Sequence, residues 1–458
     1  MEKRTTHTPA VFTFVACGIA LLATLFALCA PSSAFADDRE IMAYSLDENQ
    51  SRTFYYTTDA AISAGYEGKE IHLAVDWMFT GTMTVADSKS ITINLNGHKI
   101  TNQGGGTVIR MYENSSLTLK GYDDDGDAIS HKFFYKGYNL DTGDEADASV
   151  VTGGLITGAY LKSTDVGGIR MDNNSTLTLD NVAIAGNSGG KAGGLFVKKK
   201  CNLYMKNGAS IEQNKGSAGG IYVKEEDFNL YMDKSFIRKN YSSDSGGGLR
   251  SDADATRIYM TGDSAFLDNT AYSRAGGLNL KYSYFCVVSS DGTGKITNNK
   301  ALNGSVGGLA IGDSHCEGNE GTIQGIEISE NRSKNGAGGL IIAQEYVLLA
   351  NCTIKDNVSQ SGSYAGGVYV CNDHNIIRIV RLQAIPVVAK REAAFASTIR
   401  TMLSFAANAS SKAMCARTTI PPVMFTCAIM RASALISPAV WRKARVWASA
   451  LAKPALPR

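Results

Sequence analysis

The side chains best suited to chemistry lie in an acidic stretch between residues 121 and 152. Asp123, Asp125 and Asp127 occupy alternate positions there, and carboxylate oxygens are ligands that Ca²⁺ prefers. The EF-hand pattern does not fit, because its first position would hold Gly and its twelfth Lys. We therefore expect a solvated acidic loop that projects from the fold. A Ca²⁺ site at these three aspartates is the alternative.

Other ionisable side chains do not form a catalytic constellation in the sequence. Glu225, Glu226 and Asp227 stand together without a partner cluster in the neighbouring repeat, whereas hydrolysis of a glycosidic bond needs two facing carboxyl groups. His98 is expected in a turn, and the three lysines at 198–200 are expected on a solvated face. The sequence thus predicts no catalytic residue, no resident metal ion and no cofactor.

The cysteines do not form a complete disulfide set. Cys201, Cys286, Cys316, Cys352 and Cys371 are five in number and occupy different positions in their repeats. The second and third of them come closest to stacking on adjacent repeats. We expect buried thiols at most of these positions, and no CxxC metal pattern is present.

These residues are carried by a sequence repeat whose first signal is a pair of glycines followed by an aliphatic residue. The pair recurs eight times at spacings of 26 to 31 residues. A glycine is needed at such a corner when the backbone has a positive φ or passes close to the next repeat. The predicted corner residues are Gly167, Gly168, Gly193, Gly194, Gly219, Gly220, Gly247, Gly248, Gly276, Gly277, Gly307, Gly308, Gly338, Gly339, Gly366 and Gly367.

A second signal, an Asn three residues after an aliphatic or aromatic side chain, recurs in step with the glycines. Asn suits a turn, and stacked amides can hydrogen-bond to one another as a ladder. We therefore expect a structural Asn ladder along the repeats. Its predicted members are Asn187, Asn214, Asn240, Asn269, Asn299, Asn331 and Asn357.

The period and the residue types predict a solenoid built from strands. The apolar runs are only three to five residues long and alternate with polar residues, as in Leu203-Tyr204-Met205. Each period would hold about three short strands and three turns, which is one coil of a parallel β-helix. We predict an all-β fold of about nine or ten such coils over residues 91–379, interrupted by the acidic insertion at 121–152.

The chain before the solenoid is expected to contain two further segments. Residues 1–36 predict a secretory signal peptide, because a basic start and a long apolar run precede Ala34-Phe35-Ala36. An uncleaved membrane anchor is the alternative. Residues 37–90 are expected to cap the open end of the solenoid. They should include a helix that starts near Thr58 and ends at Gly65 or Gly68.

The composition changes abruptly at the other end. No Gly follows Gly367, and from Arg378 onward 13 Lys or Arg residues face a single acid, Glu392. We interpret residues 380–458 as repeat sequence translated in a shifted reading frame, which would form no domain. A genuine basic segment that binds an anionic surface is the alternative.

The two signals together, Gly-Gly-[Ile/Leu/Val] and [Ile/Phe]-x-x-Asn, resemble the GGA[ILV] and FxxN repeats of polymorphic outer-membrane proteins and related adhesin-like proteins with a pectin-lyase-like fold. The resemblance covers roughly residues 91–379. It departs from the family pattern because Phe precedes the Asn only at Phe266. The resemblance implies a right-handed β-helix in a bacterial protein that is secreted or displayed on the cell surface.

The resemblance leaves two functions to weigh. The first is a non-enzymatic adhesin-like binding or structural module, whose partner would be a host or cell-surface glycan or protein. The second is a lyase or glycoside hydrolase that acts on polysaccharides, as enzymes on this fold do. The carboxylate and basic motifs of those enzymes, such as Asn-Thr-Asp and Arg-Ile-Lys, are missing here. We therefore favour the first function, expect no nucleic-acid partner, and expect membrane contact only through an uncleaved signal segment.

Overall fold

The computed structural model describes residues 40–127, 132–160, 166–281, 284–312, 321–361, 364–371, 375–378 and 381–383. The chain divides into two compact units, and the second, which starts at Met42, is the subject of all that follows. The expected signal peptide at 1–36 and residues 384–458 of the expected frameshifted tail lie outside the described residues. Over the described residues, no helix is long and apolar enough to span a membrane.

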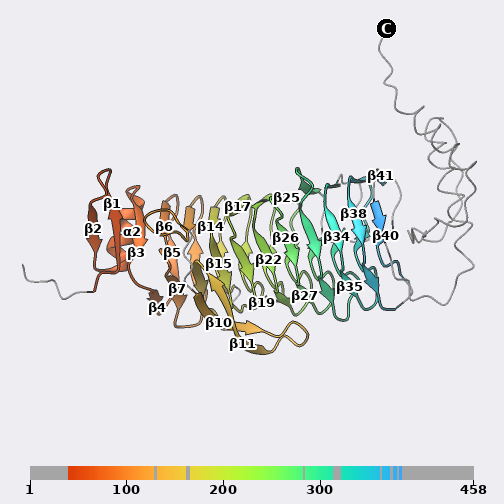
Figure 1. Ribbon diagram of the computed structural model, residues 1–458, viewed down its shortest axis with the longest axis horizontal. Coiled ribbons are helices and arrows are strands. Elements are labelled where there is room, and N and C mark those ends of the chain that lie inside the picture. Colours follow the sequence, from red (N-terminus) through yellow and green to blue (C-terminus); the bar gives the residue numbers. More distant parts are fainter. Residues whose placement is uncertain are drawn as a thin grey trace, which may run out of the picture. The chain divides into compact units, whose positions relative to one another are not determined.

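The fold is an all-β parallel solenoid of about nine turns, with about 3% of the residues in helix. Within the coils, successive strands along the chain go to different sheets, and each of these strands pairs in parallel with its counterpart one coil away (Figure 1). The short alternating runs and the fixed period predicted this architecture, because a strand of three to six residues buries one face only when identical neighbours stack on it.

The largest sheet has 13 strands. Its first members, β1 and β2, pair antiparallel, and the others from β3 onward are parallel. In spatial order they are β2 (Arg52–Tyr55), β1 (Ala43–Leu46), β3 (Glu70–Leu73), β6 (Ser90–Asn94), β9 (Ser116–Lys120), β14 (Thr176–Asp180), β17 (Cys201–Lys206), β21 (Phe228–Asp233), β25 (Ala255–Thr261), β29 (Tyr284–Ser289), β33 (Gly321–Gln324), β37 (Val347–Ala350) and β41 (Ile376–Arg378).

Two further sheets complete the walls of each coil. The eleven-stranded sheet contains β4 (Trp77–Phe79), β7 (Lys99–Asn102), β12 (Gly154–Thr157), β15 (Val182–Ala185), β18 (Ser210–Glu212), β22 (Phe236–Arg238), β26 (Ala265–Leu267), β30 (Lys295–Thr297), β34 (Glu327–Ser329), β38 (Thr353–Lys355) and β42 (Arg381–Gln383). The ten-stranded sheet contains β5 (Met83–Val85), β8 (Ile109–Met111), β13 (Ile169–Met171), β16 (Leu195–Val197), β20 (Ile221–Val223), β24 (Leu249–Ser251), β28 (Leu278–Leu280), β32 (Leu309–Ile311), β36 (Leu340–Ile342) and β40 (Val368–Val370).

A six-stranded sheet of two-residue strands lies in the turns that precede the glycine pairs. Its strands are β19 (Lys215–Gly216), β23 (Tyr241–Ser242), β27 (Thr270–Ala271), β31 (Lys300–Ala301), β35 (Arg332–Ser333) and β39 (Val358–Ser359). The strand β42 pairs with β38 and reaches Gln383, so the described solenoid continues four residues past the predicted boundary at 379.

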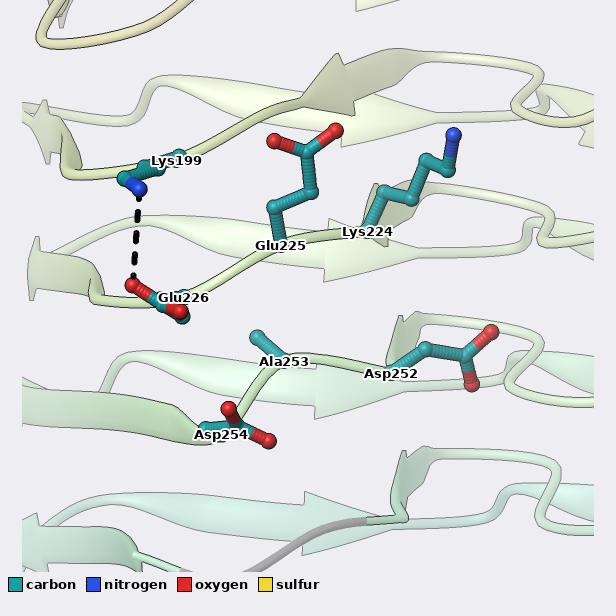
Figure 2. A pocket seen from close by; sticks show the side chains of 7 residues that line it. All are labelled: Lys199, Lys224, Glu225, Glu226, Asp252, Ala253 and Asp254. Atoms are coloured by element: carbon teal, nitrogen blue, oxygen red, sulfur yellow. Dashed lines mark ion pairs between the residues drawn. The ribbon is translucent and has the colours of Figure 1, made fainter.

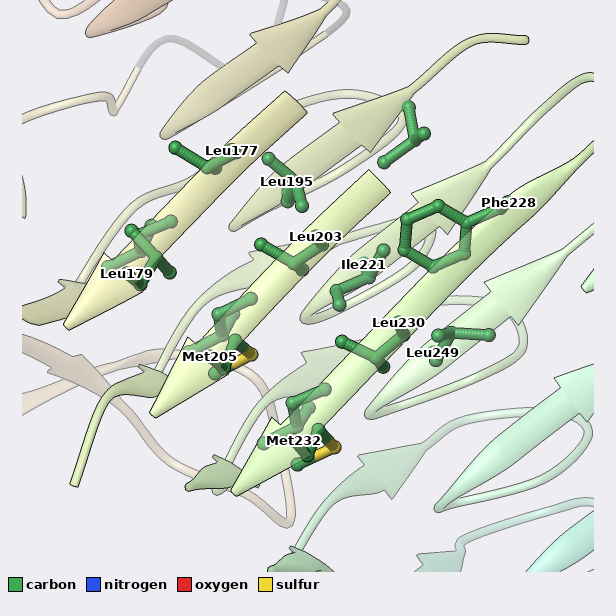
Figure 3. Close-up of a cluster of buried hydrophobic side chains, with 14 of the residues drawn as sticks. Leu177, Leu179, Leu195, Leu203, Met205, Ile221, Phe228, Leu230, Met232 and Leu249 are labelled. Atoms are coloured by element: carbon green, nitrogen blue, oxygen red, sulfur yellow. The ribbon is translucent and has the colours of Figure 1, made fainter. Parts of the chain in front are cut away.

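The core runs along the inside of the solenoid as stacked columns of apolar side chains. Leu177, Leu203 and Leu230 are register partners on neighbouring strands and are fully buried. Leu195 and Ile221 of the ten-stranded sheet are also fully buried and belong to the same cluster (Figure 3). Burial of each such side chain stabilises the fold by about 1.5–3 kcal/mol, so every added coil extends the same core.

The described helix α2 (Thr58–Tyr66) lies near the start of the unit. It begins at Thr58, near the predicted start, and its cap is the preceding residue: the Thr57 side chain accepts a hydrogen bond from the Ala60 amide at 3.2 Å. Its Gly65 packs against the core so closely that a Cβ there would lie 2.6 Å from the Ile91 side chain. The helix ends at Tyr66, between the two predicted glycines.

The insertion between β9 and β12 differs from the expected projecting loop. Its second half forms an antiparallel hairpin of β10 (Lys132–Tyr138) and β11 (Glu145–Thr152). The Tyr135 and Val151 side chains of this hairpin are buried with Leu155, Ala183 and Ala185 of the eleven-stranded sheet. The hairpin lies on the outside of the solenoid (Figure 1). Its apolar side chains cover a small apolar patch of the eleven-stranded sheet.

Candidate functional site

The outer face of the thirteen-stranded sheet carries a column of uncharged side chains, which we call the central column. It takes one residue from each of eight adjacent strands, and each residue is the register partner of the next. All eight side chains are half-buried or exposed. The members are Thr92, Thr118, Thr178, Tyr204, Tyr231, Tyr259, Val288 and Gln324.

A second column, two residues earlier on each strand, is nearly free of charge as well. We call it the flanking column, and Arg257 is its one charged member. The Arg257 guanidinium lies 3.4 Å from a carboxylate oxygen of Asp227. The column consists of Ser90, Ser116, Thr176, Asn202, Asn229, Arg257, Cys286, Thr322 and Leu348.

The three tyrosines in the middle of the central column form a stack. The ring centroids of Tyr204 and Tyr231 are 4.7 Å apart with planes 7° from parallel, and those of Tyr231 and Tyr259 are 5.1 Å apart at 14°. Because each ring face lies against the next ring, the stack presents ring edges and hydroxyl groups to solvent. A hydrogen bond with Cys286, together with burial, raises the pKa of Tyr259 to about 12. The Tyr259 phenol is therefore neutral at physiological pH.

A third column, on the other side of the tyrosines, carries four charged side chains, Lys120, Asp180, Lys206 and Asp233. Lys206 and Asp180 are register partners there, with a nitrogen-to-oxygen distance of 3.0 Å. The Asp180 carboxylate also accepts hydrogen bonds from Tyr122 at 2.5 Å and Asn207 at 2.8 Å. Burial opposes ionisation of Asp180, but these partners lower its pKa below the usual range. The carboxylate is thus charged and fully occupied by its own neighbours.

A hollow of about 240 Å³ borders this face at the turns that lead into β17, β21 and β25 (Figure 2). It is lined by Lys199, Lys224, Glu225, Glu226, Asp252, Ala253 and Asp254. The sequence prediction that the acidic residues at 225–227 have no partner cluster in the next repeat is therefore wrong. Two aspartates of the next coil line the same hollow, because the turns after the glycine-pair strands stack in register.

Glu226 and Asp252, two of the carboxylates that line the hollow, form ion pairs. Glu226 lies 3.7 Å from the Lys199 amino group. Asp252 lies 3.1 Å from the Arg250 guanidinium and accepts a hydrogen bond from the Tyr222 hydroxyl at 2.9 Å. Burial, followed by this hydrogen bond to Asp252, raises the pKa of Tyr222 to about 12. The hollow is a mixed-charge turn region that adjoins the flanking column.

The seven predicted ladder asparagines lie together in the interior, and each is completely buried. Their side-chain amides form one continuous chain, with Nδ2-to-Oδ1 distances of 2.9–3.2 Å between successive members. Each Oδ1 from Asn214 onward also accepts a hydrogen bond from the backbone N–H of the preceding ladder Asn. The ladder side chains therefore hold the coils together and are not available to a ligand.

The predicted corner glycines are explained by close approach and not by backbone conformation. None of the sixteen has a positive φ. A Cβ on Gly194 would lie 2.7 Å from the Gly220 carbonyl oxygen and 2.7 Å from the Ile211 side chain. The positive φ occurs instead at the residue before each ladder Asn, as at Gln213 and Lys239, where the sequence shows only a preference for polar residues or Gly.

The acidic residues at the start of the insertion are used in structural contacts. The Asp123 carboxylate accepts a hydrogen bond from the Asp127 amide at 2.8 Å, within the loop itself. Asp124 accepts a hydrogen bond from Tyr44 at 2.7 Å and pairs with Arg52. Among the described residues there is no group of three or more side chains able to hold a metal ion, so the structure does not bring Asp123, Asp125 and Asp127 into such a group.

The remaining candidates are dispersed. His98 lies 3.3 Å from a carboxylate oxygen of Asp76 in the first coils. The thiols of Cys201 and Cys352 are buried and free, and burial raises the pKa of both. The strand position beside Cys286 is Thr322, whereas Cys316 lies outside the described residues. Among these described residues, no candidate nucleophile therefore lies beside a base.

The surface columns escaped the sequence analysis although their signal is present. Eight or nine residues after the second glycine of each pair stand Thr-Leu-Thr at 176–178, Asn-Leu-Tyr at 202–204 and again at 229–231, and Arg-Ile-Tyr at 257–259, and strand pairing brings these tripeptides into one register. On each strand, the residue before the buried aliphatic side chain belongs to the flanking column and the residue after it belongs to the central column. A search for apolar periodicity alone does not detect the columns, because these outer positions hold mostly polar side chains.

Comparison of the chain with models of protein families, with curated proteins and with solved structures finds no match in any of the three.

Proposed function

We propose that this protein is a non-enzymatic, adhesin-like binding module whose ligand docks on the outer face of the thirteen-stranded sheet. The observation that carries the proposal is the central column, eight exposed or half-buried uncharged side chains in register. None of its eight members is charged, although 19% of the residues in the chain are charged and the next register partner beyond Thr92 is Glu70. Depletion of charge with enrichment of Tyr is typical of the centre of a recognition surface.

Rigidity supports the same proposal. Each strand of the face is hydrogen-bonded on both sides, and the Asn ladder and core fix the coils from inside. A binding surface that is already ordered loses little conformational entropy when a ligand docks. The module would act outside the cell, as the apolar N-terminal stretch and the adhesin-like repeats suggest, with a glycan or protein of a cell surface as partner.

Loss of one ring from the tyrosine stack should weaken ligand binding. We expect Tyr231→Ser to reduce the affinity for a ligand found on a glycan and protein array by about tenfold or more, which corresponds to about 1.4 kcal/mol, since the ring edge and hydroxyl lie at the centre of the face. The measurement is titration of the wild-type and variant full-length chains by biolayer interferometry.

The matched control is Tyr272→Ser, because Tyr272 is 49% exposed but lies outside the thirteen-stranded sheet. Equal binding by Tyr231→Ser and the control would contradict the assignment of the ligand to this face. Circular dichroism on both variants shows whether the fold is retained.

The hollow supports one alternative, a polysaccharide-active enzyme. Four carboxylates from two coils line it, and such enzymes use paired carboxyl groups. Against this function, the Lys199 and Arg250 contacts already occupy two of the four carboxylates. We therefore expect no release of reducing or unsaturated ends from neutral or acidic polysaccharides, with or without Ca²⁺. Turnover that is lost in Glu225→Gln or Asp254→Asn would establish the enzyme instead.

A further inference from the structure

The outer face also indicates the chemical class of its ligand, an inference that rests on the proposed function. We infer that the ligand is a neutral, hydroxyl-rich polysaccharide whose chain lies along the central column, parallel to the solenoid axis. The residues that carry the inference are the two adjacent uncharged columns on β6, β9, β14, β17 and β21.

The absence of charge from the two columns indicates an uncharged ligand. From Ser90 to Asn229 in the flanking column and from Thr92 to Tyr231 in the central column, every outer side chain is uncharged. The neighbouring Lys206 is neutralised by Asp180. An acidic polysaccharide, a nucleic acid or an acidic peptide requires cations to offset its charge. An uncharged polymer is the ligand that such a face complements.

The polar groups of the two columns indicate a ligand rich in hydroxyl groups. Both columns present hydroxyl and amide groups, which donate and accept hydrogen bonds without carrying charge. The pairs Ser90 and Thr92, Ser116 and Thr118, and Thr176 and Thr178 give three successive strands with two hydroxyls each. Asn202 and Asn229 then continue the flanking column beside the tyrosines. Sugar hydroxyls also donate and accept hydrogen bonds, so each donor on the protein can meet an acceptor on the sugar, and each acceptor can meet a donor.

The regular spacing of the strands indicates a ligand with a repeating unit. Neighbouring strands are about 4.8 Å apart, a distance comparable with the length of one pyranose ring. A polymer of identical units can therefore repeat the same contact on strand after strand. Globular proteins without a solenoid fold have no such repeat on their surface, and their binding energy comes from a few apolar or aromatic anchors in pockets. The tyrosines here are stacked on one another, so the central ring cannot insert into a pocket as an anchor.

A pair of opposite charge substitutions at one central position tests the inference. Thr178 is half-buried on β14, the middle one of the five strands that carry the inference. With full-length protein and particulate cellulose, chitin and mannan as probes, we expect Thr178→Asp and Thr178→Lys each to weaken binding about tenfold, because either charge is desolvated by an uncharged polymer. Binding of the wild-type chain should be nearly independent of salt, in contrast to an ionic complex. The matched control is Thr84→Asp, an exposed Thr of the ten-stranded sheet.

The outcomes separate this inference from the proposed function. If Thr178→Lys strengthens binding and Thr178→Asp weakens it, with alginate or polygalacturonate as the preferred probe, the ligand is acidic and the inference is wrong, while the binding face stands. If a protein from the array is the sole ligand and Tyr231→Ser weakens it, the polysaccharide class is likewise excluded. If no ligand responds to Tyr231→Ser or to either Thr178 variant, the proposed function itself fails.

Discussion

Replacing Asn269 by alanine is expected to lower the free energy of unfolding by about 4 kcal/mol or more, because several buried polar groups lose their partners at once. The Asn269 Oδ1 accepts hydrogen bonds from the Asn240 amide at 3.1 Å and its Nδ2 at 3.0 Å. The Asn269 Nδ2 donates to the Ile237 carbonyl at 2.8 Å and to Asn299 Oδ1 at 3.0 Å. Each buried group left unsatisfied costs about 1–3 kcal/mol.

The measurement is chemical denaturation followed by far-ultraviolet circular dichroism. Asn202→Ala is the matched control, because Asn202 is half-buried on the outer face and accepts a single side-chain hydrogen bond from Asn229. We expect this control to change stability by less than about 1 kcal/mol. Similar unfolding midpoints for Asn269→Ala and Asn202→Ala would show that the amide ladder does not hold the coils together.

A corner glycine should be nearly as sensitive, although it makes no side-chain contact of its own. The Cβ of Gly194→Ala would lie 2.7 Å from the Gly220 carbonyl oxygen, and real Cβ atoms do not approach a backbone atom so closely. The two coils must move apart at this point, which strains the hydrogen bond from the Leu195 amide to Gly220 at 2.8 Å. Overpacking of this kind costs about 1–3 kcal/mol and occasionally more.

Gly81→Ala provides the comparison for the corner variant. A Cβ at Gly81 meets no atom within 4 Å, and its φ is not positive. Removal of this glycine should leave stability unchanged or raise it by about 0.4–1 kcal/mol, through lower entropy of the unfolded chain. Thermal unfolding of the two variants decides the matter, and equal midpoints would refute the close-packing explanation of the glycine pairs.

The sequence was sufficient for the architecture because the same physical demand recurs in every coil. A buried amide with no room for water, as at Asn240, and a corner without space for a Cβ, as at Gly194, each tolerate one residue type. Repetition at a fixed period then makes the signal unmistakable. The helix start at Thr58 could be predicted for a similar reason, since a threonine hydroxyl at the N-cap satisfies a helix amide locally.

The candidate site was harder to predict from the sequence, because it depends on which residues of adjacent coils lie side by side. Glu225 and Asp254 are far apart in the chain and share a hollow through the register of the turns alone. The hairpin packs on the solenoid through Tyr135, whose hydroxyl donates to Glu212 at 3.2 Å. Neither contact follows from local pattern, because each joins residues that are distant in the chain, and several residue types could occupy the Glu225 and Asp254 positions at similar energy.

The stacking of coils also determines how the molecule responds to tension. Neighbouring coils are joined by the same kinds of backbone and amide hydrogen bonds along the whole ladder. A force applied between the ends loads these junctions in series, so the weakest one yields while the others remain intact. Each yielding coil of 26 to 31 residues releases roughly 100 Å of extended chain. A solenoid of this design lengthens stepwise under load, and the coils that remain stacked keep their part of the proposed binding face.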